Sequence, residues 1–289
     1  MARHEFTAPG LSRTRPPCRH VRVRILVIGG TGVAGRETAA ELVRRGHDVA
    51  VLSRRGGDGP PGTTPFAGDL VTGDGLPAAL AGTECVVDCA NVAALKRATA
   101  VEFFGSTTRR LNALARQSKV THHVVLSIVG IDKVPLGYYA GKLAQEQALR
   151  DGPVPGTVLR ATQFHEFVGQ FGARLRIGPL HLTPDLLMQP VAMSEVAQAL
   201  ADLVEAGPGT GRAPDVAGPR RERLPDLTRR LRRHQGRRAA VLRVPLTGGY
   251  GRAVRAGGLL PEPGAVLRGP TFTDWLASRP PAAQPRVQG

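Results

Sequence analysis

A tyrosine and a lysine four residues apart, Tyr138 and Lys142, form the pair in this sequence best suited to move a proton. They stand at the start of a predicted helix over residues 138–150, so the phenol and the ammonium should share one helical face. A nearby cation lowers the pKa of a tyrosine toward neutrality, which suits proton exchange with a carbonyl or alcohol oxygen. Tyr139 is the alternative, because the register at a helix start is open.

A glycine-rich segment has the spacing needed to bind a pyrophosphate. Residues 29–35 read Gly-Gly-Thr-Gly-Val-Ala-Gly and stand between an apolar strand at 21–28 and a helical pattern at 34–45. Small residues there let phosphates approach the backbone, and the amides of a helix N-terminus favour the anion. The dinucleotide contacts predicted in this segment are Gly29, Thr31, Gly32, Val33 and Gly35.

The residues after the second predicted strand, 48–52, favour NADP over NAD. They are Ser53, Arg54 and Arg55, where an acidic residue would bind the ribose hydroxyls of NAD. Arginine pairs instead with a 2′-phosphate; the alternative is that both arginines are solvated loop charges. The remaining predicted cofactor contacts are Asp69 and Leu70 near the adenine, and Ala90, Asn91 and Lys142 near the nicotinamide ribose.

Short apolar strands and helical patterns alternate along the first part of the chain. Further strands are predicted at 64–67, 85–89, 124–126 and 157–159, and further helices at 75–81 and 101–118. This rhythm predicts an α/β fold, a Rossmann-type doubly wound parallel sheet with helices on both faces.

After residue 165 the pattern loosens, which indicates a smaller C-terminal substrate-binding part. Helices are predicted at 193–206, 224–234 and 272–278, and strands at 214–217 and 239–244. Ser194 is the expected N-cap of the first of these helices, and the glycines around Tyr250 predict a turn or hinge. The expected organisation is a disordered extension at 1–20, an NAD(P)-binding domain at 21–165, the C-terminal part at 166–279 and a disordered tail at 280–289.

Composition and charge exclude several classes of protein. The sequence has 289 residues, 42% of them hydrophobic, with no apolar run long enough for a membrane span and only three cysteines. Its net charge of +16 is carried at the two ends, since residues 25–211 balance to zero. We therefore expect a cytoplasmic protein, monomeric or homodimeric, that binds a small molecule and neither a membrane nor nucleic acid.

A few other residues are weaker candidates for a functional role. Gln163, Phe164 and His165 follow the sixth strand at the carboxyl edge, where they could contact substrate. Cys85 and Cys89 face the same way in one strand without a third ligand, so they are expected in the core and no metal site is predicted.

The segments IGGTGVAG, LSRR, GDL, LSIVGI, GYYAGK and LRATQFHEF resemble the short-chain dehydrogenase/reductase superfamily, in its atypical NmrA-like, NAD(P)-binding branch. The resemblance implies that Tyr138 is the general acid/base and Lys142 its ribose-binding partner. It also implies a Ser or Thr after the fifth strand that binds the substrate carbonyl. Ser127 is the nearby hydroxyl but stands early in the segment, so its role is catalytic or merely structural.

These observations predict an NADP-dependent oxidoreductase that transfers hydride between nicotinamide and a carbonyl or alcohol carbon. Three alternatives remain open at this point. One is an epimerase of the nucleotide-sugar type that uses the same residues, and another is a non-catalytic protein that senses NADP. The third is direct DNA binding through the arginine-rich segment 220–238, which the lack of a recognisable DNA-binding motif weakens. Retention of the tyrosine and lysine favours an enzyme.

Overall fold

The computed structural model describes residues 22–92, 96–170, 176–177, 180–237 and 240–280. Its central feature is one parallel sheet with the strand order β14-β11-β6-β5-β4-β1-β2-β3, to which β10 adds beside β6. The strands are β1 Arg24–Ile28, β2 Asp48–Ser53, β3 Thr63–Ala67, β4 Cys85–Asp88, β5 His122–Ile128, β6 Gly156–Ala161, β10 Gly211–Arg212, β11 Val216–Ala217 and β14 Val266–Leu267. The predicted Rossmann-type fold is confirmed.

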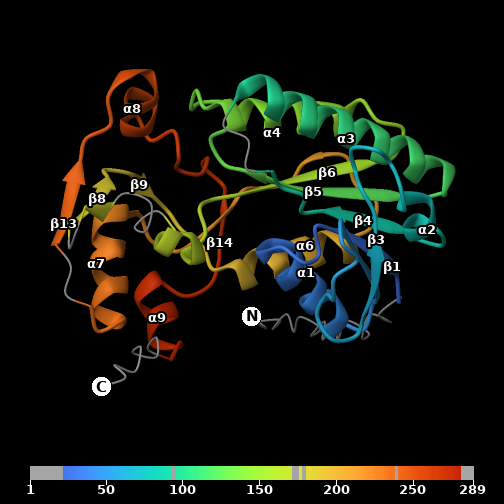
Figure 1. The fold of residues 1–289 in the computed structure, drawn as a ribbon, viewed down its shortest axis with the longest axis horizontal. Helices are drawn as coiled ribbons and strands as arrows, with labels where there is room; N and C mark the ends of the chain where they lie inside the picture. Colours follow the sequence, from blue (N-terminus) through green and yellow to red (C-terminus); the bar gives the residue numbers. More distant parts are fainter. Residues whose placement is uncertain (1–21, 93–95, 171–175, 178–179, 238–239, 281–289) are drawn as a thin grey trace, which may run out of the picture.

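Helices cover both faces of this sheet (Figure 1). Helices α3 (Arg97–Gln117) and α4 (Gly137–Arg150) lie on one face with the short α2 (Leu76–Leu80), and α1 (Val33–Arg44) and α6 (Met193–Glu205) lie on the other. Side chains of β1 alternate between the two layers: Ile25 and Val27 pack with α1 and α6, and Leu26 and Ile28 pack with α2 and α3. A strand buried on both faces explains the unbroken apolar run in the sequence.

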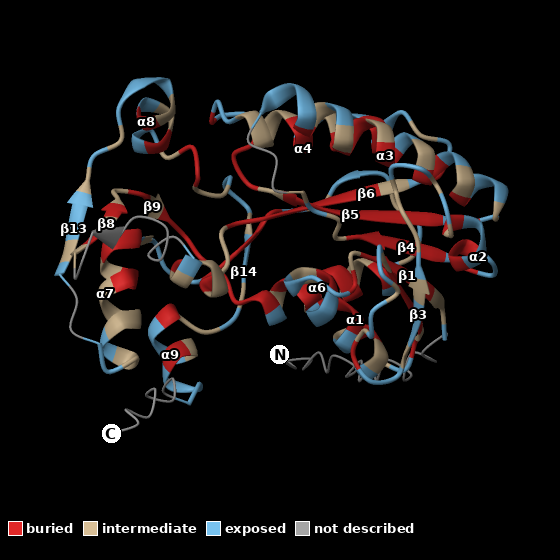
Figure 2. Ribbon diagram, in the orientation of Figure 1, coloured by how far each residue is buried: buried red, intermediate tan, exposed pale blue. Residues whose placement is uncertain are grey.

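The carboxyl ends of the strands face a second, smaller group of elements (Figure 1). It contains a sheet of β7 (Arg176–Ile177), β8 (Leu180–Pro184) and β13 (Ala240–Val244), the pair β9 (Leu187–Met188) and β12 (Glu222–Arg223), and helices α7 (Leu224–His234), α8 (Gly248–Arg255) and α9 (Phe272–Ala277). Figure 2 shows buried residues on the inner sides of these elements. Their core includes Leu224, Leu227, Val254 and Phe272.

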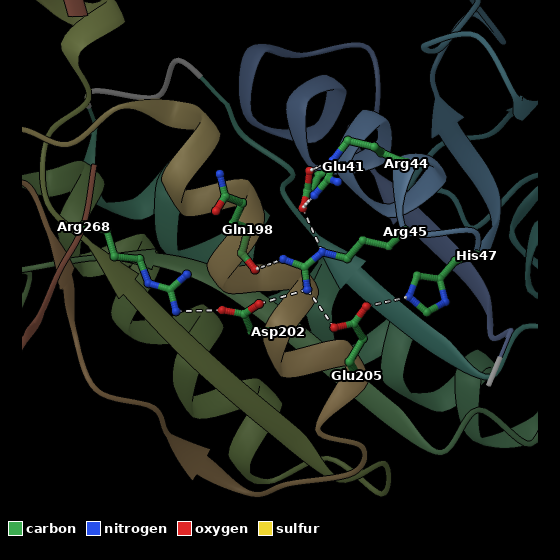
Figure 3. Close-up of polar contacts among 8 residues, drawn as sticks. All are labelled: Glu41, Arg44, Arg45, His47, Gln198, Asp202, Glu205 and Arg268. Carbon is green, nitrogen blue, oxygen red and sulfur yellow. Dashed lines mark hydrogen bonds and ion pairs between the residues drawn. The ribbon is translucent and has the colours of Figure 1, made fainter. Parts of the chain in front are cut away.

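Residues after 165 contribute to both groups. Helix α6 packs under the large sheet through Val196, Leu200 and Val204, and β10, β11 and β14 extend that sheet. A cluster of charges also ties α6 to α1 (Figure 3): the guanidinium of Arg45 bonds Glu41 at 2.7 Å, Asp202 at 2.9 Å and Glu205 at 2.7 Å. The large sheet is therefore complete only with residues beyond 165.

Two local predictions for the C-terminal part are wrong. Helix α6 begins at Met193, so Ser194 lies inside the helix, and the Glu166 carboxylate accepts from the Met193 amide at 3.3 Å instead. The expected turn around Tyr250 is the helix α8, because Tyr250 and Val254 pack into the C-terminal core and outweigh the low helix propensity of glycine. Other predicted elements agree with the structure to within a few residues; segments 1–20 and 281–289 lie outside the described residues.

None of the helices in the described part of the chain is long and apolar enough to cross a membrane.

Candidate functional site

The glycine segment forms a tight turn from β1 into α1. Gly29 has a φ of +72°, a backbone conformation that residues with a Cβ rarely adopt, and a Cβ on Gly35 would stand 2.2 Å from the Gly29 carbonyl oxygen. Helix α1 begins with no side-chain cap and no acidic residue in its first turn. This uncapped helix end at the carboxyl edge of the sheet fits the phosphates of a dinucleotide.

Predicted cofactor residues follow β2, β3 and β4 at the same edge. Arg54 and Arg55 are exposed, and the Ser53 hydroxyl accepts a hydrogen bond from the Gly57 amide at 3.1 Å. The Asp69 carboxylate accepts from the Val71 amide at 2.7 Å, so it orders its own turn. Because parallel strands end at one edge, these positions lie along the side of the sheet on which α1 begins.

Tyr138 lies against the end of β4. Its hydroxyl donates a hydrogen bond to Asn91 Oδ1 at 2.8 Å, and its ring packs edge-on against Phe104 of α3. Tyr139 turns instead toward the C-terminal core that contains Tyr250. The two neighbouring tyrosines therefore have different surroundings, and Tyr138 is the one beside the predicted nicotinamide ribose residue.

Lys142 is buried one turn along α4 from Tyr138, with 3% of its surface exposed. Its ammonium donates to the Leu126 carbonyl oxygen at 2.7 Å and to Gln145 Oε1, and it lies 5.0 Å from the centre of the Phe104 ring. Gln145 in turn donates to Asp88 Oδ2 at 2.9 Å. A continuous chain of buried polar groups thus joins Lys142 to the end of β4.

Burial changes the acidity of both members of the pair. It raises the pKa of Tyr138 to about 12, opposite to the lowering predicted from the sequence. The physical reason is that the Lys142 ammonium is directed at Leu126 and Gln145. Burial lowers the pKa of Lys142 to about 8, which nearby carboxylates, first Asp88, partly offset. At neutral pH Tyr138 is a protonated phenol and Lys142 is still charged in its larger fraction.

The Ser127 hydroxyl is hydrogen-bonded to the carboxylate of a buried ion pair. Its hydroxyl donates to Glu146 Oε1 at 2.5 Å, and Glu146 is also bonded by the guanidinium of Arg160 at 2.8 Å. Arg160 reaches Asp132 at 2.8 Å with its remaining nitrogen. The described position of Ser127 therefore serves the packing of α4 on β5 and β6, which is the structural alternative considered for this residue.

The three residues after β6 have unequal surroundings. His165 is 1% exposed, contacts Phe272 and Trp275 through its ring, and its pKa is lowered to about 4 by burial. Phe164 forms a backbone bridge to Val191 and is only partly buried. Gln163 Oε1 is buried without a hydrogen-bond partner among the described residues. Of the three, His165 is held most clearly as a core residue of the C-terminal part.

Sequence reasoning missed Asp88 and Gln145. Gln145 follows Tyr138 by seven residues and Lys142 by three, so helical spacing alone places all three on one face. Asp88 is a charge inside the otherwise apolar strand CVVDC, which is itself a signal, because a buried carboxylate needs partners.

Comparison with known families identifies the dinucleotide-binding part. Residues 29–206, more than half of the chain, match the NAD(P)H-binding family. The chain belongs to this family. The matched region contains the glycine turn, the Tyr138–Lys142 pair and α6, and it confirms the expected likeness to NAD(P)-binding proteins.

One curated relative is the chloroplastic divinyl chlorophyllide a 8-vinyl-reductase of rice, Oryza sativa subsp. indica. It is 26% identical to this chain over 250 residues, which are 77% of this chain and 61% of the relative. The chain thus spans about three fifths of the length of that reductase.

Solved structures share the fold. An NADPH-dependent quinone oxidoreductase from Escherichia coli, in complex with NADPH, superposes with a TM-score of 0.68 at 17% identity, covering 88% of this chain and 98% of that one. The UDP-Glc/GlcNAc 4-epimerase from Campylobacter jejuni gives a TM-score of 0.69 at 12% identity, covering 88% and 99%. At these sequence identities the likeness shows a shared fold alone.

Proposed function

We propose that this protein is an NADP-dependent oxidoreductase that transfers hydride between nicotinamide and a carbonyl or alcohol carbon of a small organic substrate. The observation that carries the proposal is the hydrogen bond between Tyr138 and Asn91, one turn of α4 from the buried Lys142. This supports the proposal because a proton donor and a polar side chain meet after β4, at the edge where dinucleotide-binding sheets bind their ligands.

The residues that would hold the cofactor are the glycine turn for the pyrophosphate and Arg54 or Arg55 for the 2′-phosphate. Both arginines are exposed, and neither forms a hydrogen bond or ion pair with another described residue. Their guanidinium groups are therefore available to a phosphate. Asp69, Leu70 and Ala90 would line the rest of the dinucleotide, with Asn91 and Lys142 at the nicotinamide ribose.

Bound NADPH supplies the hydride in the reducing direction. Tyr138 supplies the proton, because a phenol with a raised pKa is protonated at neutral pH and can donate to an oxyanion as it forms. The Lys142 ammonium, which is directed at Leu126 and Gln145, would hold the nicotinamide ribose and so position the dinucleotide relative to Tyr138. Asn91, which accepts from the same hydroxyl, orients the phenol before the substrate arrives.

The substrate carbonyl lacks an assigned hydroxyl partner once Ser127 is bonded to Glu146. Asn91 accepts from Tyr138 in the described structure, and its amide nitrogen can donate to a substrate oxygen once the phenol has turned its single proton from Asn91 Oδ1 toward that oxygen. We therefore assign Asn91 the carbonyl-binding role that the family resemblance had suggested for Ser127.

Transfer of isotope from the cofactor tests this proposal. Purified protein is incubated with NADPH deuterated at C4 and with panels of aldehydes, ketones, quinones and conjugated alkenes; the alkenes are included because the rice relative is named a vinyl reductase. The proposal predicts NADPH oxidation at 340 nm and one deuterium on the carbon of a reduced carbonyl product. Deuterium on an alkene carbon would replace the carbonyl assignment. A sugar substrate inverted without net NADPH oxidation would identify an epimerase, and tight NADPH binding without any turnover would identify a sensing protein.

A further inference from the structure

A cavity of about 680 Å³ lies on the side of α4 that faces away from Tyr138 and Lys142. It is bounded by the loop that leads into α4, the first turns of α3 and α4, and α8. Figure 1 shows α8 across from the end of the α3–α4 layer at which both helices begin. The volume is in the range of sites that hold a drug-sized molecule.

The cavity and the proposed dinucleotide site lie on different faces of α4. Ala140 and Leu143 line it, three residues apart on one face of α4, together with Leu136, the extended residue directly before the helix. Tyr138 and Lys142 occupy another face, and the contrast in exposure is large: 36% for Leu143 against 3% for Lys142. A molecule in the cavity would contact α4 without contacting the proton-transfer pair.

The floor of the cavity is apolar. Leu136 and Leu143 belong to the few large hydrophobic side chains that are more than a third exposed, and Val134, Pro135 and Ala253 continue the same surface. Isolated exposed leucines are ordinary on a protein surface. Two of them side by side in one hollow provide apolar surface that a ligand would remove from water.

Two arginines that line the cavity carry positive charge that no residue of the described ranges neutralises. Two lining cations, Arg97 and Arg252, are exposed and form no hydrogen bond or ion pair with another residue of the described ranges. The other charged lining residues are paired: Asp132 with Arg160 at 2.8 Å, and Lys133 with Glu262. Helices α3, α4 and α8 also begin here without an acidic residue in the first turn, which adds to the positive potential.

From the apolar floor and the two unpaired arginines we propose that this cavity binds a small organic anion with an apolar body, of the aliphatic or aromatic carboxylate class. The apolar body lies on Leu136 and Leu143, and the carboxylate lies between Arg97 and Arg252. Charge complementarity selects this ligand, since a neutral molecule of the same shape leaves both guanidinium groups uncompensated. The site is separate from the proposed catalytic site, and only the use of NADP⁺ in its test rests on the proposed function.

Fluorescence of the aryl sulfonate 8-anilino-1-naphthalenesulfonate reports on such a site. The dye is titrated into the full-length protein with saturating NADP⁺, which fills the dinucleotide site and does not fluoresce. We expect the dye to bind under these conditions and decanoate to displace it at least about fivefold more effectively than decan-1-ol, in keeping with one charge-assisted contact in a partly exposed site. Loss of all dye binding in NADP⁺, or equal displacement by the alcohol, would overturn the proposal.

Matched variants assign the binding to these residues. Arg97→Ala and Arg252→Ala should each weaken dye and decanoate binding about fivefold, whereas Arg116→Ala, at the exposed far end of the same helix α3, should change neither. Leu143→Ser should weaken both ligands, and Val71→Ser, at a comparably exposed apolar side chain, should have no effect. NADP⁺ affinity unchanged in every variant shows that each is folded. Equal affinities for the dye in Arg97→Ala, Arg252→Ala and Arg116→Ala would contradict the assignment.

Discussion

The hydroxyl of Tyr138 donates a 2.8 Å hydrogen bond to Asn91 Oδ1, which joins the first turn of α4 to the loop after β4. The two residues are 47 positions apart in the sequence and meet at the carboxyl edge of the sheet. The bond distinguishes Tyr138 from its neighbour Tyr139, whose ring packs with the C-terminal core. It also gives the proposed proton donor a fixed direction before any substrate is bound.

The cofactor preference is predicted from the exposed arginines after β2. NADPH should bind at least ~10-fold more tightly than NADH, because one charge-assisted contact with the 2′-phosphate contributes roughly 1.5–3 kcal/mol. Arg54→Ala, Arg55→Ala and the double variant should reduce that ratio, and Arg36→Ala, an arginine of α1 bonded to the Asp58 carbonyl oxygen, serves as the control. Fluorescence titration measures both affinities. Equal binding of NADPH and NADH by the unchanged protein would refute an NADP-specific site.

Gln145 is predicted to position Lys142. Gln145→Leu removes the group that bonds both the Lys142 ammonium and Asp88, so two buried charges lose a partner. We expect the free energy of unfolding to fall by about 1–3 kcal/mol and the NADPH dissociation constant to rise several-fold. Urea unfolding and titration measure these quantities. The matched control is Gln147→Leu, on the exposed side of α4 and bonded to Asp151, and it should change neither. If Gln145→Leu is less stable but binds NADPH with the same affinity and the same dependence of that affinity on pH, Gln145 has a structural role only.

The pH dependence of NADPH binding should report the charge of Lys142. Its pKa is lowered to about 8 by burial, so the side chain is charged below pH 8 and loses a proton as the pH rises through that value. NADPH affinity should therefore decrease between about pH 7 and 9, a range in which the ribose phosphate is already fully ionised. Lys142→Met should bind weakly and with no such decrease. An unchanged pH profile in this variant would exclude Lys142 as the titrating group.

The cluster that ties α1 to α6 offers a test of stability. Arg45 has a side chain 15% exposed and bonds three carboxylates, whereas Arg44 is 69% exposed and bonds only Glu41 (Figure 3). Arg45→Met should lower the free energy of unfolding by about 1–3 kcal/mol, because it leaves three carboxylates close together without their shared cation. Arg44→Met should cost less than about 1 kcal/mol. Denaturant unfolding measures the free energy of unfolding of both variants. If it falls by similar amounts in the two, burial of the cluster contributes nothing to stability.

The elements described between residues 22 and 161 could be predicted well because their signals are local. A strand such as β1 is apolar at every position after Arg24, and the glycines at 29 and 35 are required by the backbone turn itself. The C-terminal part depends on contacts between distant residues. The carboxylate that caps α6 comes from Glu166, and α8 is held by packing of Tyr250 and Val254, so neither could be predicted from neighbouring residues.

The candidate site shows the same division. The spacing of Tyr138 and Lys142 predicts a shared helical face, and both residues lie on it. Spacing does not predict which partners the side chains bind. The Lys142 ammonium bonds Leu126 and Gln145, and the Ser127 hydroxyl bonds Glu146. These partners meet because of the way β4, β5 and β6 lie next to one another. Two features of the sequence signal this network: Asp88, a carboxylate in an apolar strand, and the helical spacing of Gln145 from Lys142.

The central claim is tested most directly by removing a single oxygen atom. In Tyr138→Phe the proton donor is lost while the ring and its contact with Phe104 remain. Once the isotope experiment has identified a substrate, this variant should keep its NADPH affinity within about twofold and lose turnover by roughly 10²-fold or more, the scale expected for a general acid. Tyr139→Phe should retain turnover near that of the unchanged protein. Full turnover by Tyr138→Phe would contradict the proposed mechanism.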